Sequence, residues 1–166
     1  MPVIEADPTL YTGVRYAHET CASVLDFRMP RRLGTGGAPR ARARGARVVL
    51  APGAGLNGAV ETGVAVLGEL GHGRVIVAHG DLPLAGPMAW LSRSVGVTLV
   101  PDHRDDGTNV ACIPTHAGFR FSYGPGSLAR HEPEGRRLGL SVRIVRDPLL
   151  ARDVDEPADL LGLEIV

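Results

Sequence analysis

From residue 45 onward, short runs of β-branched residues alternate with segments whose apolar residues recur at helical spacing. The runs that predict buried strands are GARVVLAP (45–52), RVIVAHGDLP (74–83), VTLVPD (97–102), NVACIP (109–114) and LSVRIVRD (140–147). The segments that predict helices are GLNGAVETGVAVLGELG (55–71), PMAWLSRSVG (87–96) and SLARHEPEGRRLG (127–139). We expect FRFSYG (119–124) to continue the sheet, and 151–163 to form a turn and a short helix. This alternation predicts a three-layer α/β domain with a mostly parallel sheet.

The composition favours the same class of fold. The 166 residues suffice for a single domain, 1–166. Hydrophobic residues make up 44% of the chain and aromatic residues only 4%, so Val, Leu, Ile and Ala must build the core. The formal net charge is zero, which gives no argument for nucleic acid or a membrane as a partner, and neither is expected. All 18 basic residues are arginines, so phosphate must be bound by Arg, a metal ion or backbone N–H groups.

Cysteines and apolar runs exclude several classes of protein. Cys21 and Cys112 are too few for a disulfide framework or a four-ligand zinc site, and we interpret them as buried or incidental thiols. No apolar run approaches the roughly 20 residues of a membrane span. The first residues, MPVIEADPTLYTG, lack the basic patch and apolar stretch of a signal peptide, so a cytoplasmic location is expected.

Residues 1–44 differ in character from the rest. Between Phe27 and Val60 there are seven arginines and no Asp or Glu, and 28–42 has almost no apolar periodicity. We predict loop or disorder over 28–42. A solvated or poorly folded segment is favoured over a basic arm that binds phosphate. Translation of a shifted reading frame is a third interpretation, since GC-rich DNA read out of frame yields Arg, Gly, Ala and Pro.

Three carboxylates lie where strands are predicted to end. Asp81 directly follows the run at 74–80, where α/β sheets bind ligands, although a single Asp there can also cap a helix or a turn. Asp153 and Asp155 are two residues apart, so an extended chain projects both to one face, where like charges repel unless a cation lies between them. The alternative is a solvated strand end before a helix cap. Together the three carboxylates predict a Mg²⁺ site.

Two further segments carry polar groups suited to an anion. In YGPGS (123–127) a tight glycine turn precedes Ser127 at a helix start, so its backbone N–H groups can face a phosphate or carboxylate. The alternative is a plain turn with a Ser cap. Thr108 and Asn109 place short hydrogen-bonding side chains at the exit of the loop DDGTN, which alone is a weak signal.

The order of these motifs resembles one family. The motifs are GLN at 55–57, HGDLP at 79–83, GTN at 107–109, YGPGS with a His four residues on at 123–131, and DVDEPADL at 153–160. They are similar to those of the guanylyltransferases of coenzyme F-420 assembly, which include the 2-phospho-L-lactate and phosphoenolpyruvate guanylyltransferases. The resemblance covers about residues 45–161. It implies a Rossmann-like fold of the GT-A type.

The resemblance also implies roles for individual residues. Those implied to bind the catalytic Mg²⁺ are Asp81, Asp153 and Asp155. Those implied to contact the phosphorylated acid are Thr108, Gly124 and Ser127. Those implied to lie on the nucleotide side are Gly55, Leu56 and Asn57. His131 matches a family position to which no role is assigned.

The implied reaction joins GMP from GTP to phosphoenolpyruvate or 2-phospho-L-lactate and releases pyrophosphate. The GC-rich residue usage favours the bacterial branch, and hence phosphoenolpyruvate. The family begins with a loop containing Lys and Arg that binds the triphosphate, whereas Arg15 is the one cation in residues 1–20 here, so the N-terminal unit is expected to be incomplete. The alternatives are an inactive or truncated remnant that only binds a phosphorylated acid, and a mispredicted gene product. A homodimer stays open.

Overall fold

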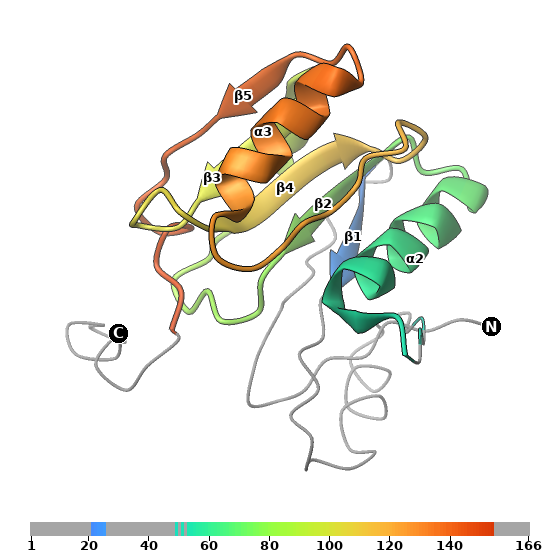
Figure 1. Ribbon diagram of the computed structural model, residues 1–166. Coiled ribbons are helices and arrows are strands. Elements are labelled where there is room, and N and C mark those ends of the chain that lie inside the picture. Colours follow the sequence, from blue (N-terminus) through green and yellow to red (C-terminus); the bar gives the residue numbers. More distant parts are fainter. Residues whose placement is uncertain (1–20, 26–48, 50, 52, 155–166) are drawn as a thin grey trace.

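The computed structural model describes residues 21–25, 49, 51 and 53–154. Its elements in chain order are β1 (Cys21–Leu25), α2 (Gly55–Glu69), β2 (Arg74–Ala78), the 3₁₀ helix η1 (Ala89–Arg93), β3 (Val97–Pro101), β4 (Thr108–Pro114), α3 (Ser127–Arg137) and β5 (Val142–Ile144) (Figure 1). The arginine-rich segment at 28–42 and most of the N-terminal unit lie outside the described residues. The same holds for Asp155 and the short helix expected near the C-terminus.

The five strands form one mixed sheet in the order β1-β2-β4-β3-β5. The pairs β1·β2 and β3·β5 are parallel, whereas β4 runs antiparallel to both β2 and β3. The α/β class is therefore confirmed, but the prediction of a mostly parallel sheet is wrong for the described pairings. The physical reason is the connection between β3 and β4, which spans only 102–107. Parallel neighbours need a crossover of about a dozen residues or more, so this short loop joins antiparallel strands.

The sheet separates two apolar layers because its side chains alternate between its faces. In β2, Val75 and Val77 pack under the two helices, whereas Ile76 and Ala78 face the opposite side. Helices α2 and α3 cover the first face, and η1 with its flanking loops covers the second (Figure 1). No helix in the described ranges is long and apolar enough to cross a membrane.

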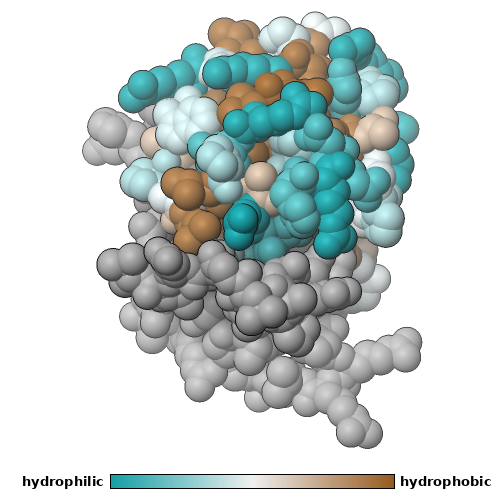
Figure 2. Space-filling model, turned by 90° about the vertical axis from the view of Figure 1, so that its left-hand side faces the viewer, coloured by the Kyte–Doolittle hydropathy of each residue, from teal (hydrophilic) through white to brown (hydrophobic). Residues whose placement is uncertain are grey.

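One face of the described part can be judged by its polarity. Figure 2 shows one face of the molecule, on which hydrophilic residues predominate and apolar residues form separate groups. The large apolar side chains exposed in the described part are Leu70, Val95 and Leu149. Single exposed apolar residues are common on folded domains and indicate no particular partner.

Two segments differ from their predicted structure. Residues 119–124 form no strand and instead lie against both helices, with Phe119, Phe121 and Tyr123 buried in the helix-side core. No element was predicted at Cys21–Leu25, yet this strand pairs along its whole length with β2. Its Cys-Ala-Ser start has little β-branched character, which hides the strand in the sequence.

Close contact between α3 and the sheet requires a glycine. A Cβ atom at Gly135 would lie 2.7 Å from Cγ2 of Val142 and 3.4 Å from Cγ2 of Val97. We predict that Gly135→Val lowers the free energy of unfolding by about 1–3 kcal/mol, because the added side chain overpacks this contact. Urea denaturation measures the change. The control is Gly73→Val, where nothing lies within 4 Å of the added Cβ, and its effect should stay within about 0.5 kcal/mol. Equal losses in both variants would contradict the role of Gly135.

Candidate functional site

The predicted site residues in the described part gather at one edge of the sheet. The strands β2, β3 and β5 end at this edge, whereas β4, α2 and α3 begin there (Figure 1). The residues found at or next to these termini are Gly55, Leu56, Asn57, Asp81, Thr108, Gly124, Ser127 and Asp153. These residues therefore share one edge of the sheet, although the predicted direction of β4 is wrong.

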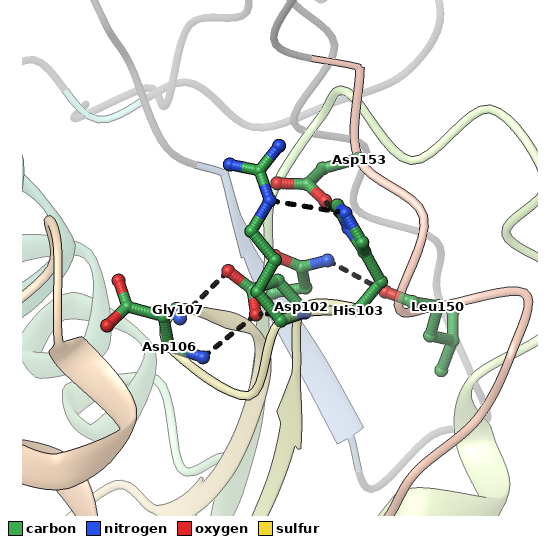
Figure 3. Close-up of polar contacts among 8 residues, drawn as sticks. Asp102, His103, Asp106, Gly107, Leu150 and Asp153 are labelled. Carbon is green, nitrogen blue, oxygen red and sulfur yellow. Dashed lines mark hydrogen bonds and ion pairs between the residues drawn. The ribbon is translucent and has the colours of Figure 1, made fainter. Parts of the chain in front are cut away.

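The main chains that bear Asp81 and Asp153 lie side by side. The N–H of Val154 donates to the carbonyl oxygen of Asp81 at 3.0 Å. The Oδ1 atom of Asp153 is buried, and no hydrogen-bond donor of the described residues reaches it. Nδ1 of the half-exposed His103 lies 3.7 Å from this oxygen (Figure 3). A buried carboxylate oxygen without a donor favours a cation beside it, which fits a divalent ion.

The full set of three carboxylates is not within the described residues. Asp155 lies outside them, and no group of three His, Cys, Asp or Glu side chains able to hold a metal ion occurs in the described ranges. The assignment of Asp81, Asp153 and Asp155 to Mg²⁺ thus stays a prediction, for which the first two lie on adjacent segments.

A basic pair beside Asp153 was not predicted from the sequence. The Nε atom of Arg104 donates to Nε2 of His103 at 3.3 Å, and both residues are exposed. They belong to the loop 102–107, which also contains three aspartates. The signal available in the sequence was His-Arg directly after a predicted strand end. The guanidinium of Arg104 thus places positive charge next to His103, the neighbour of Asp153.

Asp102 shapes the loop that separates β3 from β4. Its Oδ1 accepts the N–H groups of Arg104 at 2.9 Å and Asp106 at 3.0 Å, and its Oδ2 accepts that of Gly107 at 2.9 Å (Figure 3). A carboxylate that accepts three backbone N–H groups fixes the path of the loop. It therefore sets where β4 begins and where Thr108 and Asn109 lie.

The glycine turn at 124–127 already holds a carboxylate of the same chain. The N–H of Gly126 donates to Oδ2 of Asp106 at 2.8 Å, and the N–H of Leu128 donates to the carbonyl oxygen of Asp106 at 3.1 Å. The N–H of Ser127 donates to the carbonyl oxygen of Gly124 at 3.0 Å. The predicted N–H groups for a bound anion are thus engaged within the chain. Gly124 and Ser127 stay predicted contacts of the acid.

His131 is fully buried and connects Thr108 to the segment before the glycine turn. The N–H of Ser122 donates to Nε2 at 2.9 Å, so the neutral ring carries its proton on Nδ1, which lies 3.1 Å from Oγ1 of Thr108. Burial, and to a smaller extent the charges of Arg130 and His79, lower the pKa of His131 to about 4, and Glu134 opposes the shift. A neutral His131 thus orients the hydroxyl of Thr108.

Residues 120–123 are held by side-chain acceptors from both helices. Successive N–H groups donate alternately to α3 and α2. The pairs are Arg120 to Oε1 of Glu134 (3.0 Å), Phe121 to Oε1 of Glu61 (3.1 Å), Ser122 to Nε2 of His131 (2.9 Å) and Tyr123 to Oδ1 of Asn57 (2.7 Å). These bonds replace the sheet ladder expected for this segment. Asn57, which the resemblance places on the nucleotide side, therefore uses its side-chain carbonyl oxygen to hold the main chain at Tyr123.

Comparison with known proteins agrees with this arrangement of motifs. The family described as "Guanylyl transferase CofC like" matches residues 39–166, which is most of the chain. The chain belongs to this CofC-like family. Membership covers the elements from α2 to β5 and the acidic segment that bears Asp153.

Three relatives of this CofC-like chain carry different names. A "Phosphoenolpyruvate guanylyltransferase" of Conexibacter woesei is 41% identical over 118 residues, covering 66% of this chain and 52% of the relative. A "2-phospho-L-lactate guanylyltransferase" of Halorubrum lacusprofundi is 40% identical over 104 residues, covering 60% and 47%. A "3-phospho-D-glycerate guanylyltransferase" of Phenylobacterium zucineum is 34% identical over 126 residues, covering 72% and 58%. The chain spans about half the length of the curated relatives it matches.

The buried His131 predicts a loss of stability in acid. Its pKa is about 4 in the folded chain, against 6.5 for an unperturbed histidine, so the unfolded chain takes up the proton first as the pH falls. The contribution of His131 to the free energy of unfolding should be complete above pH 6.5 and decrease by up to about 3 kcal/mol towards pH 4. Urea denaturation between pH 7 and pH 4 measures this. His131→Gln should reduce the dependence of the free energy of unfolding on pH, whereas His116→Gln, at an exposed histidine, should leave that dependence unchanged. If the dependence is unchanged in His131→Gln, groups other than His131 cause the loss of stability in acid.

Proposed function

We propose that this chain transfers GMP from GTP to a small phosphorylated three-carbon acid and releases pyrophosphate, in coenzyme F-420 biosynthesis. The observation that supports the proposal most is the hydrogen bond from Val154 to Asp81, which brings the segments bearing Asp81 and Asp153 together at the site edge. Membership of the CofC-like family and the names of the relatives support the same reaction. A Rossmann-like fold of the GT-A type is proposed with it.

The proposed reaction requires positioning more than a strong base. A phosphate oxygen of the acid attacks the α-phosphorus of GTP, and the bond from that phosphorus to the β-phosphate oxygen breaks. Pyrophosphate leaves with the electron pair. The attacking phosphate is already ionised, so no side chain has to remove a proton from it.

The chain's own groups supply charge and orientation. Asp81, Asp153 and Asp155 would hold a Mg²⁺ ion, which when bound neutralises charge on the phosphates. Arg104 donates to Nε2 of His103, which lies beside Asp153, and so brings positive charge to this edge in a chain that has no lysine. Arg104 is therefore proposed to meet the triphosphate of GTP.

The phosphorylated acid is expected to bind beside Thr108 and Ser127, at the same edge of the sheet. Because Nδ1 of His131 donates to Oγ1 of Thr108, the hydroxyl hydrogen of Thr108 is left to donate to an anion. Ser127 lies next to the loop that precedes Thr108, because the N–H of the following residue, Leu128, donates to the carbonyl oxygen of Asp106 in that loop. Phosphoenolpyruvate is the first acid to test, followed by 2-phospho-L-lactate and 3-phospho-D-glycerate, since relatives carry all three names.

The proposal predicts pyrophosphate release that needs both substrates. The chain is incubated with GTP, Mg²⁺ and each of the three acids in turn, and pyrophosphate is followed by a coupled assay. We expect release with phosphoenolpyruvate and none when the acid is left out. A folded chain that releases no pyrophosphate with any acid would reject the reaction, and acid binding by calorimetry would then identify a binding remnant.

Neutralising one carboxylate tests the metal site. We predict that Asp153→Asn lowers kcat by at least about 100-fold, because the site loses charge that holds the divalent ion. Glu69→Gln is the control, since this exposed residue lies at the far end of α2, and it should retain full activity. Turnover by Asp153→Asn equal to that of the unsubstituted chain would remove Asp153 from the proposed site.

A further inference from the structure

We infer that Asn109 is a positioning residue that holds the segments bearing Asp81 and Asp153 at a fixed spacing. The inference rests on the proposed function, in which these two carboxylates bind a divalent ion. It arises from three observations about this residue at the start of β4: a bulge in the strand, a side-chain hydrogen bond and a main-chain hydrogen bond.

The first observation is a bulge in the sheet. In the pairing of β3 with β4, Val100 lies opposite Val110 but Pro101 lies opposite Thr108, so Asn109 is an extra residue. An extra residue interrupts the alternation of side chains and re-aims those around it. Thr108 consequently points to His131 under α3, whereas Val110 packs on the opposite face of the sheet.

The second observation is the side-chain contact of Asn109. This side chain is buried, with 2% of its surface exposed, and its Nδ2 donates to the carbonyl oxygen of Leu150 at 3.0 Å (Figure 3). Leu150 ends a tight turn in which Oδ1 of Asp147 accepts the N–H groups of Leu149 and Leu150. Asp153 follows shortly after Leu150 in the chain. The amide of Asn109 thus fixes the turn from which the second acidic segment leaves.

The third observation is the main-chain contact. The carbonyl oxygen of Asn109 accepts the N–H of His79 at 2.9 Å, two residues before Asp81. One residue therefore contacts both acidic segments, at Leu150 and at His79. The two segments also contact each other directly, through the hydrogen bond from Val154 to Asp81. Removing the amide of Asn109 should weaken this hydrogen bond and leave the rest of β4 paired.

Hydrogen exchange tests the positioning directly. Asn109→Leu keeps the size of the side chain and removes the donor to Leu150. We expect the Val154 amide to exchange about tenfold faster in this variant, as one hydrogen bond is lost from the arrangement. Thr115→Val is the matched control, because it removes a bond from Oγ1 to the carbonyl oxygen of His72, 2.5 Å long, at the other end of β4. It should leave the exchange of Val154 unchanged.

Binding of Mn²⁺ alone, measured by calorimetry on the full chain, gives the second readout. Asn109→Leu should raise the dissociation constant of Mn²⁺ about 10-fold to 100-fold, as found for side chains that hold metal ligands in place, and Thr115→Val should not change it. If Asn109→Leu fails to fold, Asn109→Ala replaces it, since it also removes the donor and adds no bulk.

The outcomes separate the inference from the proposed function. Faster exchange at Val154 with weaker Mn²⁺ binding, in the Asn109 variant alone, supports the positioning role. Unchanged exchange at Val154 overturns it, whatever the metal affinity. Faster exchange with unchanged Mn²⁺ binding also overturns it, because the spacing would then not matter to the ion. If Mn²⁺ does not bind the unsubstituted chain, the proposed metal site fails, and the exchange result alone decides whether Asn109 holds the two segments.

Discussion

The candidate site depends on the turn between β3 and β4, and the carboxylate of Asp102 stabilises that turn. It accepts three backbone N–H groups of the loop 102–107, so β4 turns back beside β3 instead of crossing over to a parallel position. A Cβ atom at Gly107 would lie 2.8 Å from Oδ2 of Asp102, so a larger residue there would disturb the same contact. Because β4 starts at the edge where β2, β3 and β5 end, Thr108 and Asn109 join the acidic strand ends.

The helices depend on a second set of polar contacts. Residues 120–123 lie in extended form against α2 and α3, and their N–H groups alternate between acceptors of the two helices. Each acceptor is a side chain that sequence reading would assign to solvent or to a ligand, as with Asn57. Buried N–H groups need such partners, and here the helices provide them in place of a neighbouring strand. The fold and the site therefore share residues: His131 holds the main chain at Ser122 and the hydroxyl of Thr108.

Sequence reasoning predicted local elements and convergence well and long-range pairing poorly. The helix at 55–69 has apolar residues at helical spacing, and a glycine follows both this helix and the one at 127–137. Asp81 and Asp153 were expected near each other, and their segments lie side by side. Helix–strand alternation predicts crossovers between parallel strands, but the connection 102–107 is too short for one, so the predicted direction of β4 is wrong. The alternating aromatic residues of FRFSYG have the period of a strand, and only the positions of Glu61 and Glu134 explain why no strand forms. The bulge at Asn109 has no signal in composition or period, since it depends on which residues of β3 face it.

The central claim is that the carboxylates of Asp81 and Asp153 bind one divalent ion at this edge of the sheet. The most direct measurement is the anomalous scattering of Mn²⁺ in crystals of the full chain grown with GTP. We predict one Mn²⁺ peak within about 2.0–2.6 Å of oxygen atoms from both carboxylates. A peak bound to only one of them, or an ion held by GTP away from both, would contradict it.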